Sequence, residues 1–145
     1  MNYFDHCYYI NLDKRVDRKN HFLKNVIPFL GLDKKDYTRI NAVDTSSEQT
    51  TAERASGCSL SHLKTLKLAE QKDYTSVIVL EDDFTPTVSK KTFKKYLKFL
   101  YTNYSDFNVC QISYNDDIGK DVIKGVPLDE SGIVLFSPSA QTTSG

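Results

Sequence analysis

The feature of this sequence that most limits its fold is the alternation of short strand-like runs with segments of helical periodicity. Strand-forming residues fill 7–12, 38–43 and 75–81. Apolar residues recur at helical spacing over 16–30 and again over 90–104. This order predicts an α/β fold with a mostly parallel central sheet flanked by helices.

Single residues mark where the helices should begin or end. Pro28 is expected to stop or kink the first helix. The polar stretch 45–57 lacks core residues and predicts a loop. The next helix is expected to begin with Ser59 as its N-cap. Its apolar residues recur at every third position: Leu60, Leu63, Leu66 and Ala69.

Length and charge narrow the class of protein. The 145 residues suffice for a single domain with one core. Lysine plus arginine and aspartate plus glutamate number 19 each, so net charge gives no attraction to nucleic acid or to an anionic membrane. The chain stops soon after the strand-like run "GIVLF", with no closing helix. We therefore expect one domain over 1–145 that is truncated at its C-terminus.

Cysteine usage and the N-terminus bear on the compartment. Cys7, Cys58 and Cys110 are odd in number and form no C-x-x-C pair, so neither a zinc site nor a disulfide framework is predicted. The first residues do not resemble a signal peptide, and no window approaches the length of a membrane span. A cytoplasmic protein is expected.

Three carboxylates, Glu81, Asp82 and Asp83, follow directly on the third expected strand. Alternate residues of an extended chain face the same way, so Glu81 and Asp83 could converge while Asp82 turns elsewhere. Oxygen ligands suit magnesium, calcium or manganese, and such a cation would hold a phosphate-bearing ligand. The alternative is a solvated acidic turn, with Pro86 ending the strand.

Polar clusters also follow the first two strands, at 11–18 and at Asp44. Parallel strands would gather these clusters at the carboxyl edge of the sheet, where α/β folds bind ligands. Arg15 and Arg18 are three residues apart, so on a first helical turn they share a face suited to phosphate. The alternative is an ordinary charged turn in which an aspartate caps the helix.

The stretch "GCSLSHLK" supplies a fourth group of candidates. Ser61 and His62 are expected in the first turn of a helix, where free backbone N–H groups attract anions. Gly57 would allow a ligand to approach closely. The alternatives are a capping role for the serines and a partly buried, hydrogen-bonded histidine.

Four stretches together resemble glycosyltransferase family 25: "YYINLDKRVDRK", "RINAVD", "GCSLSHLKTLKLA" and "VIVLEDD". The family includes lipooligosaccharide galactosyltransferases of bacteria and procollagen galactosyltransferases, with relatives in large DNA viruses. The resemblance covers nearly the whole chain. It implies a GT-A type nucleotide-sugar-binding fold, a UDP-sugar donor (UDP-galactose being the commonest) and a divalent metal, typically Mn²⁺ with Mg²⁺ as the alternative.

Residue by residue, the resemblance assigns roles to the motifs. Glu81-Asp82-Asp83 resembles the D-x-D motif, with Asp83 as the metal ligand, Glu81 in support and Asp82 facing the ribose or sugar. The other matching residues are implied to surround the donor: Asn11, Arg15 and Arg18 near the nucleotide, Val43 and Asp44 near the uracil or ribose, and Ser61 and His62 at the helix start.

The implied reaction is inverting transfer of a sugar, in particular galactose, from a UDP-sugar to a hydroxyl of a glycan or a collagen-like hydroxylysine. The leaving diphosphate needs positive charge, and the acceptor needs a base, usually a carboxylate. The base is left open between Asp116, Asp117 and residues beyond Gly145. The oligomeric state is also open.

Two other functions fit parts of the sequence. A non-catalytic module could keep the nucleotide-sugar site without turnover. A haloacid-dehalogenase-type phosphatase is suggested by Glu81, Asp83 and Thr85, which echo D-x-D-x-T. That chemistry uses an aspartate nucleophile at the first position, where this chain has a glutamate.

Overall fold

The computed structural model divides the chain into two compact units, Met1–Thr92 and Phe93–Gly145, which are described separately. The single domain expected over the whole chain stays a prediction. The residues that the structure describes are 3–45, 47, 50–104, 106, 108–110, 112, 126–127 and 134–135.

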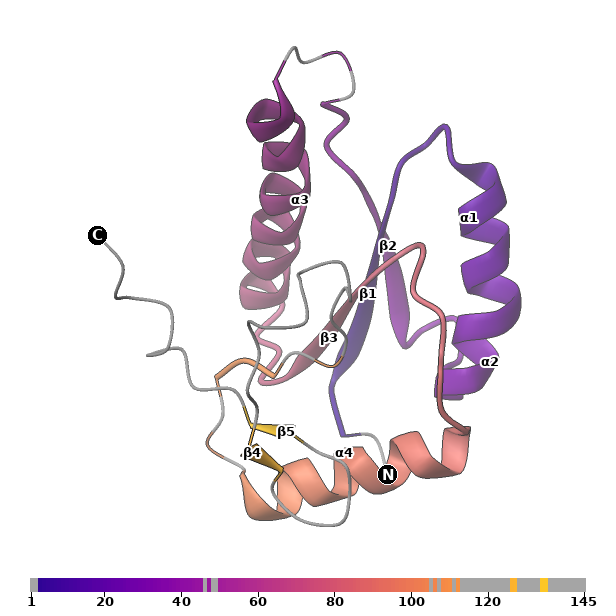
Figure 1. Cartoon of the computed structure of the whole chain (residues 1–145), viewed down its shortest axis with the longest axis vertical. Helices are drawn as coiled ribbons and strands as arrows, with labels where there is room; N and C mark the ends of the chain where they lie inside the picture. Colours follow the sequence, from indigo (N-terminus) through magenta and orange to yellow (C-terminus); the bar gives the residue numbers. More distant parts are fainter. Residues whose placement is uncertain are drawn as a thin grey trace. The chain divides into compact units, whose positions relative to one another are not determined.

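A three-stranded parallel sheet forms the centre of the first unit (Figure 1). Its strands are β1 (His6–Asn11), β2 (Tyr37–Asn41) and β3 (Val77–Glu81), in the order β2-β1-β3. In the register of the sheet, Asn11 pairs with Asn41 and Ile10 pairs with Glu81. The three carboxyl ends therefore reach the same edge, as the predicted parallel sheet requires.

Helices cover both faces of this sheet. In Figure 1, α3 (Thr51–Gln71) lies on one side. On the other side lies a continuous helical segment made of α1 (Val16–His21), η1 (Phe22–Val26) and α2 (Ile27–Leu30). The flanked parallel sheet confirms the predicted α/β class.

The core is built around β1, whose six residues are all buried. Tyr8 and Ile10 pack with Ile40 and Ala69 in a cluster that includes α3. Tyr9 points to the opposite face, where its ring stacks on Phe22 with a centroid distance of 4.4 Å. Alternation along the strand thus feeds both cores, and each fully buried apolar side chain contributes about 1.5–3 kcal/mol.

The first helical segment passes through Pro28 rather than ending there. Because proline has no N–H, the turn before it widens into a π-helix, and the Ile27 N–H bonds to the Phe22 carbonyl, five residues back. The segment ends at Gly31, whose φ of 74° is the left-handed conformation that glycine adopts easily. Its N–H bonds to the Ile27 carbonyl at 2.9 Å.

The helix predicted to begin at Ser59 begins at Thr51 instead. The predicted loop 45–57 was wrong from Thr51 onward, because 52–55, Ala-Glu-Arg-Ala, are good helix formers whose polarity resembles that of a loop. Gly57 therefore lies inside α3. A Cβ built on it would come within 2.5 Å of the Thr45 hydroxyl and 2.8 Å of the Val43 carbonyl oxygen. The glycine admits this chain's own backbone, where the sequence suggested a ligand.

The buried face of α3 is unusually polar. Ser61 and Thr65 are almost completely buried, together with Ala69. Both hydroxyls bond to the carbonyl four residues earlier, at 2.6 Å for Ser61 and 2.8 Å for Thr65. The leucines of the three-residue repeat are instead about half exposed: Leu60, Leu63 and Leu66.

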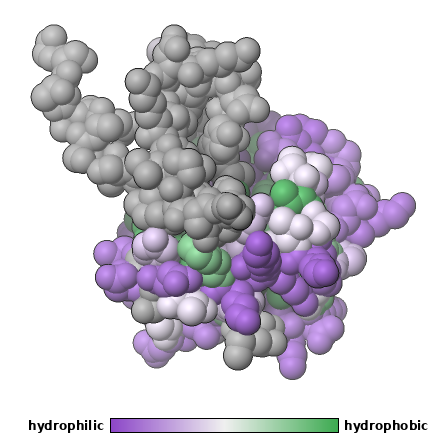
Figure 2. Space-filling model, turned by 60° about the horizontal axis from the view of Figure 1, so that its bottom comes forward, coloured by the Kyte–Doolittle hydropathy of each residue, from purple (hydrophilic) through white to green (hydrophobic). Residues whose placement is uncertain are grey.

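The helix α4 (Lys90–Asn103) spans the boundary between the units and confirms the predicted amphipathic helix. Its start is capped by Ser89, whose Oγ accepts the Thr92 N–H at 3.1 Å. Leu97 is its buried residue. The second unit also contains the antiparallel pair β4 (Val126–Pro127) and β5 (Val134–Leu135). Figure 2 shows described residues that are mostly hydrophilic on the face drawn.

Candidate functional site

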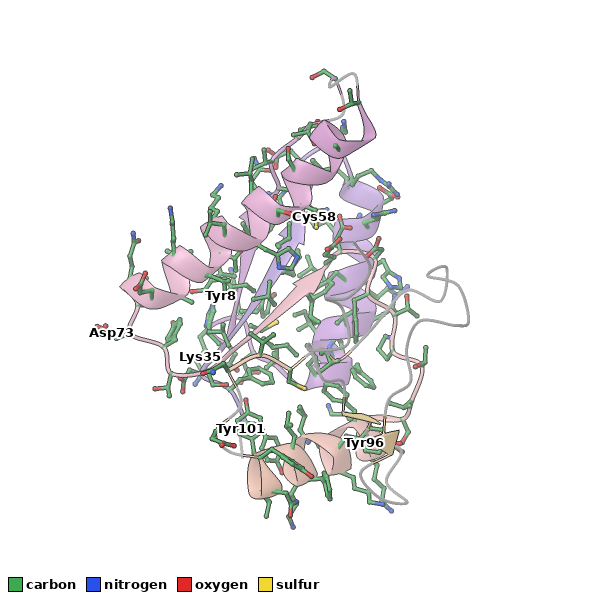
Figure 3. The ribbon with its side chains drawn as sticks, turned by 60° about the vertical axis from the view of Figure 1, so that its left-hand side comes forward. Tyr8, Lys35, Cys58, Asp73, Tyr96 and Tyr101 are labelled. Atoms are coloured by element: carbon green, nitrogen blue, oxygen red, sulfur yellow. The ribbon has the colours of Figure 1, made fainter. Side chains whose placement is uncertain are left out.

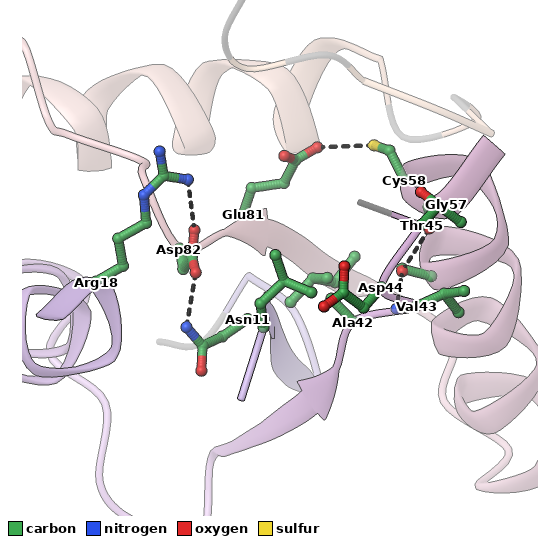
Figure 4. Close-up of a pocket in the computed structure, with 13 residues that line it drawn as sticks. Asn11, Arg18, Ala42, Val43, Asp44, Thr45, Gly57, Cys58, Glu81 and Asp82 are labelled. Carbon is green, nitrogen blue, oxygen red and sulfur yellow. Dashed lines mark hydrogen bonds and ion pairs between the residues drawn. The ribbon is translucent and has the colours of Figure 1, made fainter. Parts of the chain in front are cut away.

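A pocket of about 280 Å³ opens at the carboxyl edge of the sheet (Figure 4). The ends of all three strands, the first turn of α1 and the first half of α3 contribute to it. From β1 the chain adds β2 on one side of the sheet and then β3 on the other side. Open α/β sheets bind ligands at such a switch point in the strand order. The lining consists of Ile10, Asn11, Leu12, Arg18, Ala42, Val43, Asp44, Thr45, Gly57, Cys58, Ser61, Glu81 and Asp82.

Asn11 is the central polar residue of this edge and is 1% exposed. Its Nδ2 donates to Asp82 Oδ2 at 2.6 Å and to the Arg15 carbonyl at 3.0 Å. Its Oδ1 accepts from Arg39 Nε at 2.8 Å. Both donors and the acceptor of the carboxamide are therefore engaged, which fixes its orientation. Sequence reasoning missed Arg39, since only the strand register brings it to Asn11.

Asp82 is 6% exposed and is held between two elements. Besides Asn11, it contacts Arg18 of α1, whose Nη1 lies 3.2 Å from Asp82 Oδ1 and 3.1 Å from Asp83 Oδ2. Glu81 and Asp83 were expected to converge, with Asp82 turned away. The chain instead turns at Glu81, whose carbonyl accepts the Phe84 N–H, so strand alternation ends there. Asp82 and Asp83 share Arg18.

Glu81 points toward α3 (Figure 4). Its Oε1 lies 3.2 Å from Cys58 Sγ and 3.3 Å from His62 Nε2. Figure 3 shows Cys58 on the side of α3 that faces the sheet. Burial, together with the Glu81 and Asp83 carboxylates, raises the pKa of the Cys58 thiol to about 11. The sulfur is consequently a protonated donor to Glu81 at neutral pH.

Two of the expected basic and acidic groups are paired locally. Arg15 makes a bidentate pair with Asp17, at 2.9 and 2.7 Å. For Arg15 this pair fits the charged turn considered as the alternative, although no side-chain hydrogen bond caps the start of α1. Asp44 is joined to Lys14 at 2.7 Å, which brings a second cation beside the pocket. Arg18 therefore lines the pocket while Arg15 does not.

Ser61 positions one wall of the pocket. Its Oγ accepts the Val43 N–H at 2.9 Å and donates to the Gly57 carbonyl at 2.6 Å. The expectation that Ser61 and His62 lie in a first helical turn is wrong, because α3 begins ten residues before Ser61. Backbone N–H groups in the middle of a helix are bonded within it and attract no anion.

Most of the predicted site residues lie together. Three of them, Arg15, His62 and Asp83, do not line the pocket but each contacts a residue that does. Asp116 and Asp117 lie outside the described residues. The missed lining residues mostly flank predicted ones by a few positions. For Cys58 the available signal was its spacing of four from His62, which places both on one helical face.

The family model for glycosyltransferase family 25, described as LPS biosynthesis protein, matches residues 4–118. The chain belongs to glycosyltransferase family 25. The resemblance is thereby confirmed, and the three-stranded parallel sheet flanked by helices is compatible with a GT-A-like fold. No curated protein and no solved structure shows a significant match. Within the described residues, no helix has the length and apolarity needed to cross a membrane.

Membership of glycosyltransferase family 25 implies a nucleotide sugar and a glycan acceptor. The two carboxylates expected to hold a divalent ion, Glu81 and Asp83, are half exposed in their side chains. Mg²⁺ is commonly bound by one or two carboxylates plus substrate phosphates, so this donor set fits a hard cation. Asp83 is in ion-pair contact with Arg18, which a cation would have to displace.

Proposed function

We propose that this family 25 protein transfers galactose from UDP-galactose to a hydroxyl group, on a glycan or a collagen-like hydroxylysine, with inversion at the anomeric carbon. The observation that carries the proposal is the pocket at the switch point, where Asn11, Asp82 and Arg18 meet. Such a pocket is the usual place for a nucleotide in an open parallel sheet. A cytoplasmic location stays a prediction.

Positive charge at the pocket suits a diphosphate. Arg18 lines the pocket with 38% of its side chain exposed, and its guanidinium can bind a phosphate in bidentate fashion. Lys14, paired with Asp44, lies close by. We assign Arg18 to the diphosphate and the segment of Val43 and Asp44 to the uracil and ribose.

Asp83 is proposed to hold Mn²⁺ or Mg²⁺ beside the diphosphate, and Glu81, which faces α3, would have to turn toward Asp83 to join it. The bound ion supplies positive charge that offsets the charge developing on the leaving group. Asp82 is proposed to orient Asn11 and Arg18 rather than to bind the metal ion, because its two oxygens are already held by these two residues. The acceptor hydroxyl still needs a base, and Asp116 and Asp117 stay candidates for it.

The first test is calorimetric titration of UDP into the full chain, with Mn²⁺ and with a chelator. Micromolar binding that requires Mn²⁺ is expected, since the pocket carboxylates repel a diphosphate without a cation. Asp83→Ala should abolish the Mn²⁺ dependence, whereas the matched surface variant Asp106→Ala should bind as wild type. Equal binding in Mn²⁺ and in chelator would contradict the metal role.

A transfer assay separates catalysis from binding. Labelled UDP-galactose is offered with hydroxylysine peptides and with oligosaccharides, and label on the acceptor is counted. Transfer that fails in Asp83→Ala supports the enzyme. UDP binding without transfer to any acceptor would favour a non-catalytic binding module. The family assignment lends no support to a phosphatase.

A further inference from the structure

We propose that Cys58, His62 and Glu81 form a second metal site, one that takes Zn²⁺ or a similar thiolate-binding divalent ion. This inference goes beyond the proposed function and does not depend on it. It also departs from the sequence, in which the missing C-x-x-C pair predicted no zinc site.

Two elements bring the three side chains together. Cys58 and His62 are four residues apart on α3 and so share a face of the helix. Glu81 is the last residue of β3 and reaches toward that face. The sulfur, a ring nitrogen and a carboxylate oxygen all lie within 4.8 Å of one another. Among the residues that the structure describes, no other group of three His, Cys, Asp or Glu side chains is placed to hold a metal ion.

The spacing of the ligand atoms suits a tetrahedral ion. Glu81 Oε1 lies 3.2 Å from Cys58 Sγ and 3.3 Å from His62 Nε2. Zinc bonds of about 2.0–2.3 Å in a tetrahedron place neighbouring ligand atoms roughly 3.3–3.6 Å apart. An ion could therefore replace the two hydrogen bonds with small movements of the side chains. The thiol proton would leave to solvent as the Zn–S bond forms.

The chemistry of the donors selects the ion. Thiolate and imidazole favour Zn²⁺ over the hard cations, whereas oxygen-only sets favour Mg²⁺ and Mn²⁺. Three protein ligands leave a fourth position open, as in catalytic rather than structural zinc sites. The three residues are partly or fully exposed, so solvent ions can reach them. Cys58 and Glu81 also line the pocket, so a bound ion would lie beside it.

Glu81 is shared with the oxygen-only site proposed for the sugar donor, but the other ligands differ. Cys58 and His62 belong to α3, and Asp83 faces Arg18 of α1. Variants of Cys58 and of Asp83 therefore separate the two metal proposals.

The test is Zn²⁺ titration of the metal-free full chain in competition with a chromophoric chelator. One Zn²⁺ per chain is expected, with affinity falling about tenfold or more in Cys58→Ser and in His62→Ala. Cys110→Ser, which changes another exposed cysteine, should bind as wild type. Asp83→Asn should also keep Zn²⁺ while losing Mn²⁺-dependent UDP binding.

Cobalt gives a readout on the wild-type chain, which is informative even if the Cys58 variant folds poorly. Co²⁺ bound to wild type should show the near-ultraviolet charge-transfer absorption of a Co–thiolate bond, and Cys58→Ser should lack it. A wild-type spectrum without this absorption, or Zn²⁺ binding equal in wild type and a folded Cys58→Ser, would overturn the site. Failure of UDP binding alone would overturn the donor proposal and leave this one standing.

Discussion

Asp82 and Asp83 are adjacent in sequence but have different roles at the scale of the residue. Asp82 is nearly buried between Asn11 and Arg18, whereas the Asp83 side chain is 57% exposed. A buried carboxylate with two partners is costly to alter, because its partners are left unsatisfied. An exposed ion pair contributes about 1 kcal/mol or less. Substitution of Asp82 should therefore affect mainly stability, and substitution of Asp83 mainly ligand binding.

We expect Asp82→Asn to lower the free energy of unfolding by about 2 kcal/mol, because one amide NH₂ must face a donor already present. Asp83→Asn should lower it by no more than about 0.5–1 kcal/mol. Urea unfolding followed by circular dichroism measures both. Similar losses in the two variants would show that Asp82 is not the structural member of the pair.

His6 makes the stability of the sheet depend on pH. Its Nε2 lies 2.9 Å from the Thr38 hydroxyl, and its ring stacks on Tyr74 at 5.1 Å. Burial lowers the pKa of His6 below its usual 6.5, against the opposing charge of Asp36. The unfolded chain therefore takes up the proton first as pH falls. The contribution of His6 to stability is present above pH 6.5 and is lost as pH falls below it.

Replacing His6 with Phe keeps the ring stacking and removes the proton. Between about pH 8 and pH 5, wild type should lose more stability than His6→Phe, because only wild type loses the contribution of His6. Thermal unfolding at a series of pH values measures the two slopes. Parallel slopes would assign the acid sensitivity to other groups.

At the scale of the element, Gly57 decides how closely α3 approaches the segment after β2. Gly57→Ala improves helix propensity by about 1 kcal/mol but places a Cβ against Thr45 and the Val43 carbonyl. Since one of these contacts is backbone, we expect net destabilisation and weaker UDP binding. Ser59→Ala in the same helix is the control and should change stability by less than about 0.5 kcal/mol. A stabilised Gly57→Ala would show that the segment yields.

The three strands of the parallel sheet and α4 could be predicted from the sequence, and the start of α3 could not. Runs such as Val77–Leu80 and the stripe around Leu97 carry their own periodicity. The buried face of α3 is made of Ser61 and Thr65, whose hydroxyls bond within the helix. Apolar periodicity therefore points to the leucines, which are exposed, and predicts a cap at Ser59, which lies inside the helix.

The site shows the same division at the scale of the whole molecule. That polar residues gather at one edge follows from the parallel order of the strands, and this was predictable. Which carboxylate meets which cation depends on the register and on where the chain turns. Arg39 reaches Asn11 through the pairing of β1 with β2, and Glu81 turns to α3. No local pattern contains that information.

Hydrogen exchange tests the central role of β1 in the first unit. All six of its residues are buried, while β2 includes exposed positions at Thr38 and Asn41. Amides of β1 should exchange only by global unfolding, with an exchange free energy equal to that from urea, and those of β2 should exchange sooner. Faster exchange in β1 than in β2 would place the stable core elsewhere.

The side-chain amide of Asn11, whose hydrogen-bonding groups are all engaged, links a positive and a negative residue in one hydrogen-bonded chain. Arg39, which also pairs with Asp13, donates to its oxygen, and its nitrogen donates to Asp82. Hydrogen bonds linked in this way polarise one another. An anion that draws Arg18 away from Asp82 would leave that carboxylate more dependent on its hydrogen bond from Asn11. The hydrogen bond from Arg39 to Asn11 would strengthen in turn. Residues at the edge of β2 that no ligand touches should thus help to set how tightly the pocket holds an anion.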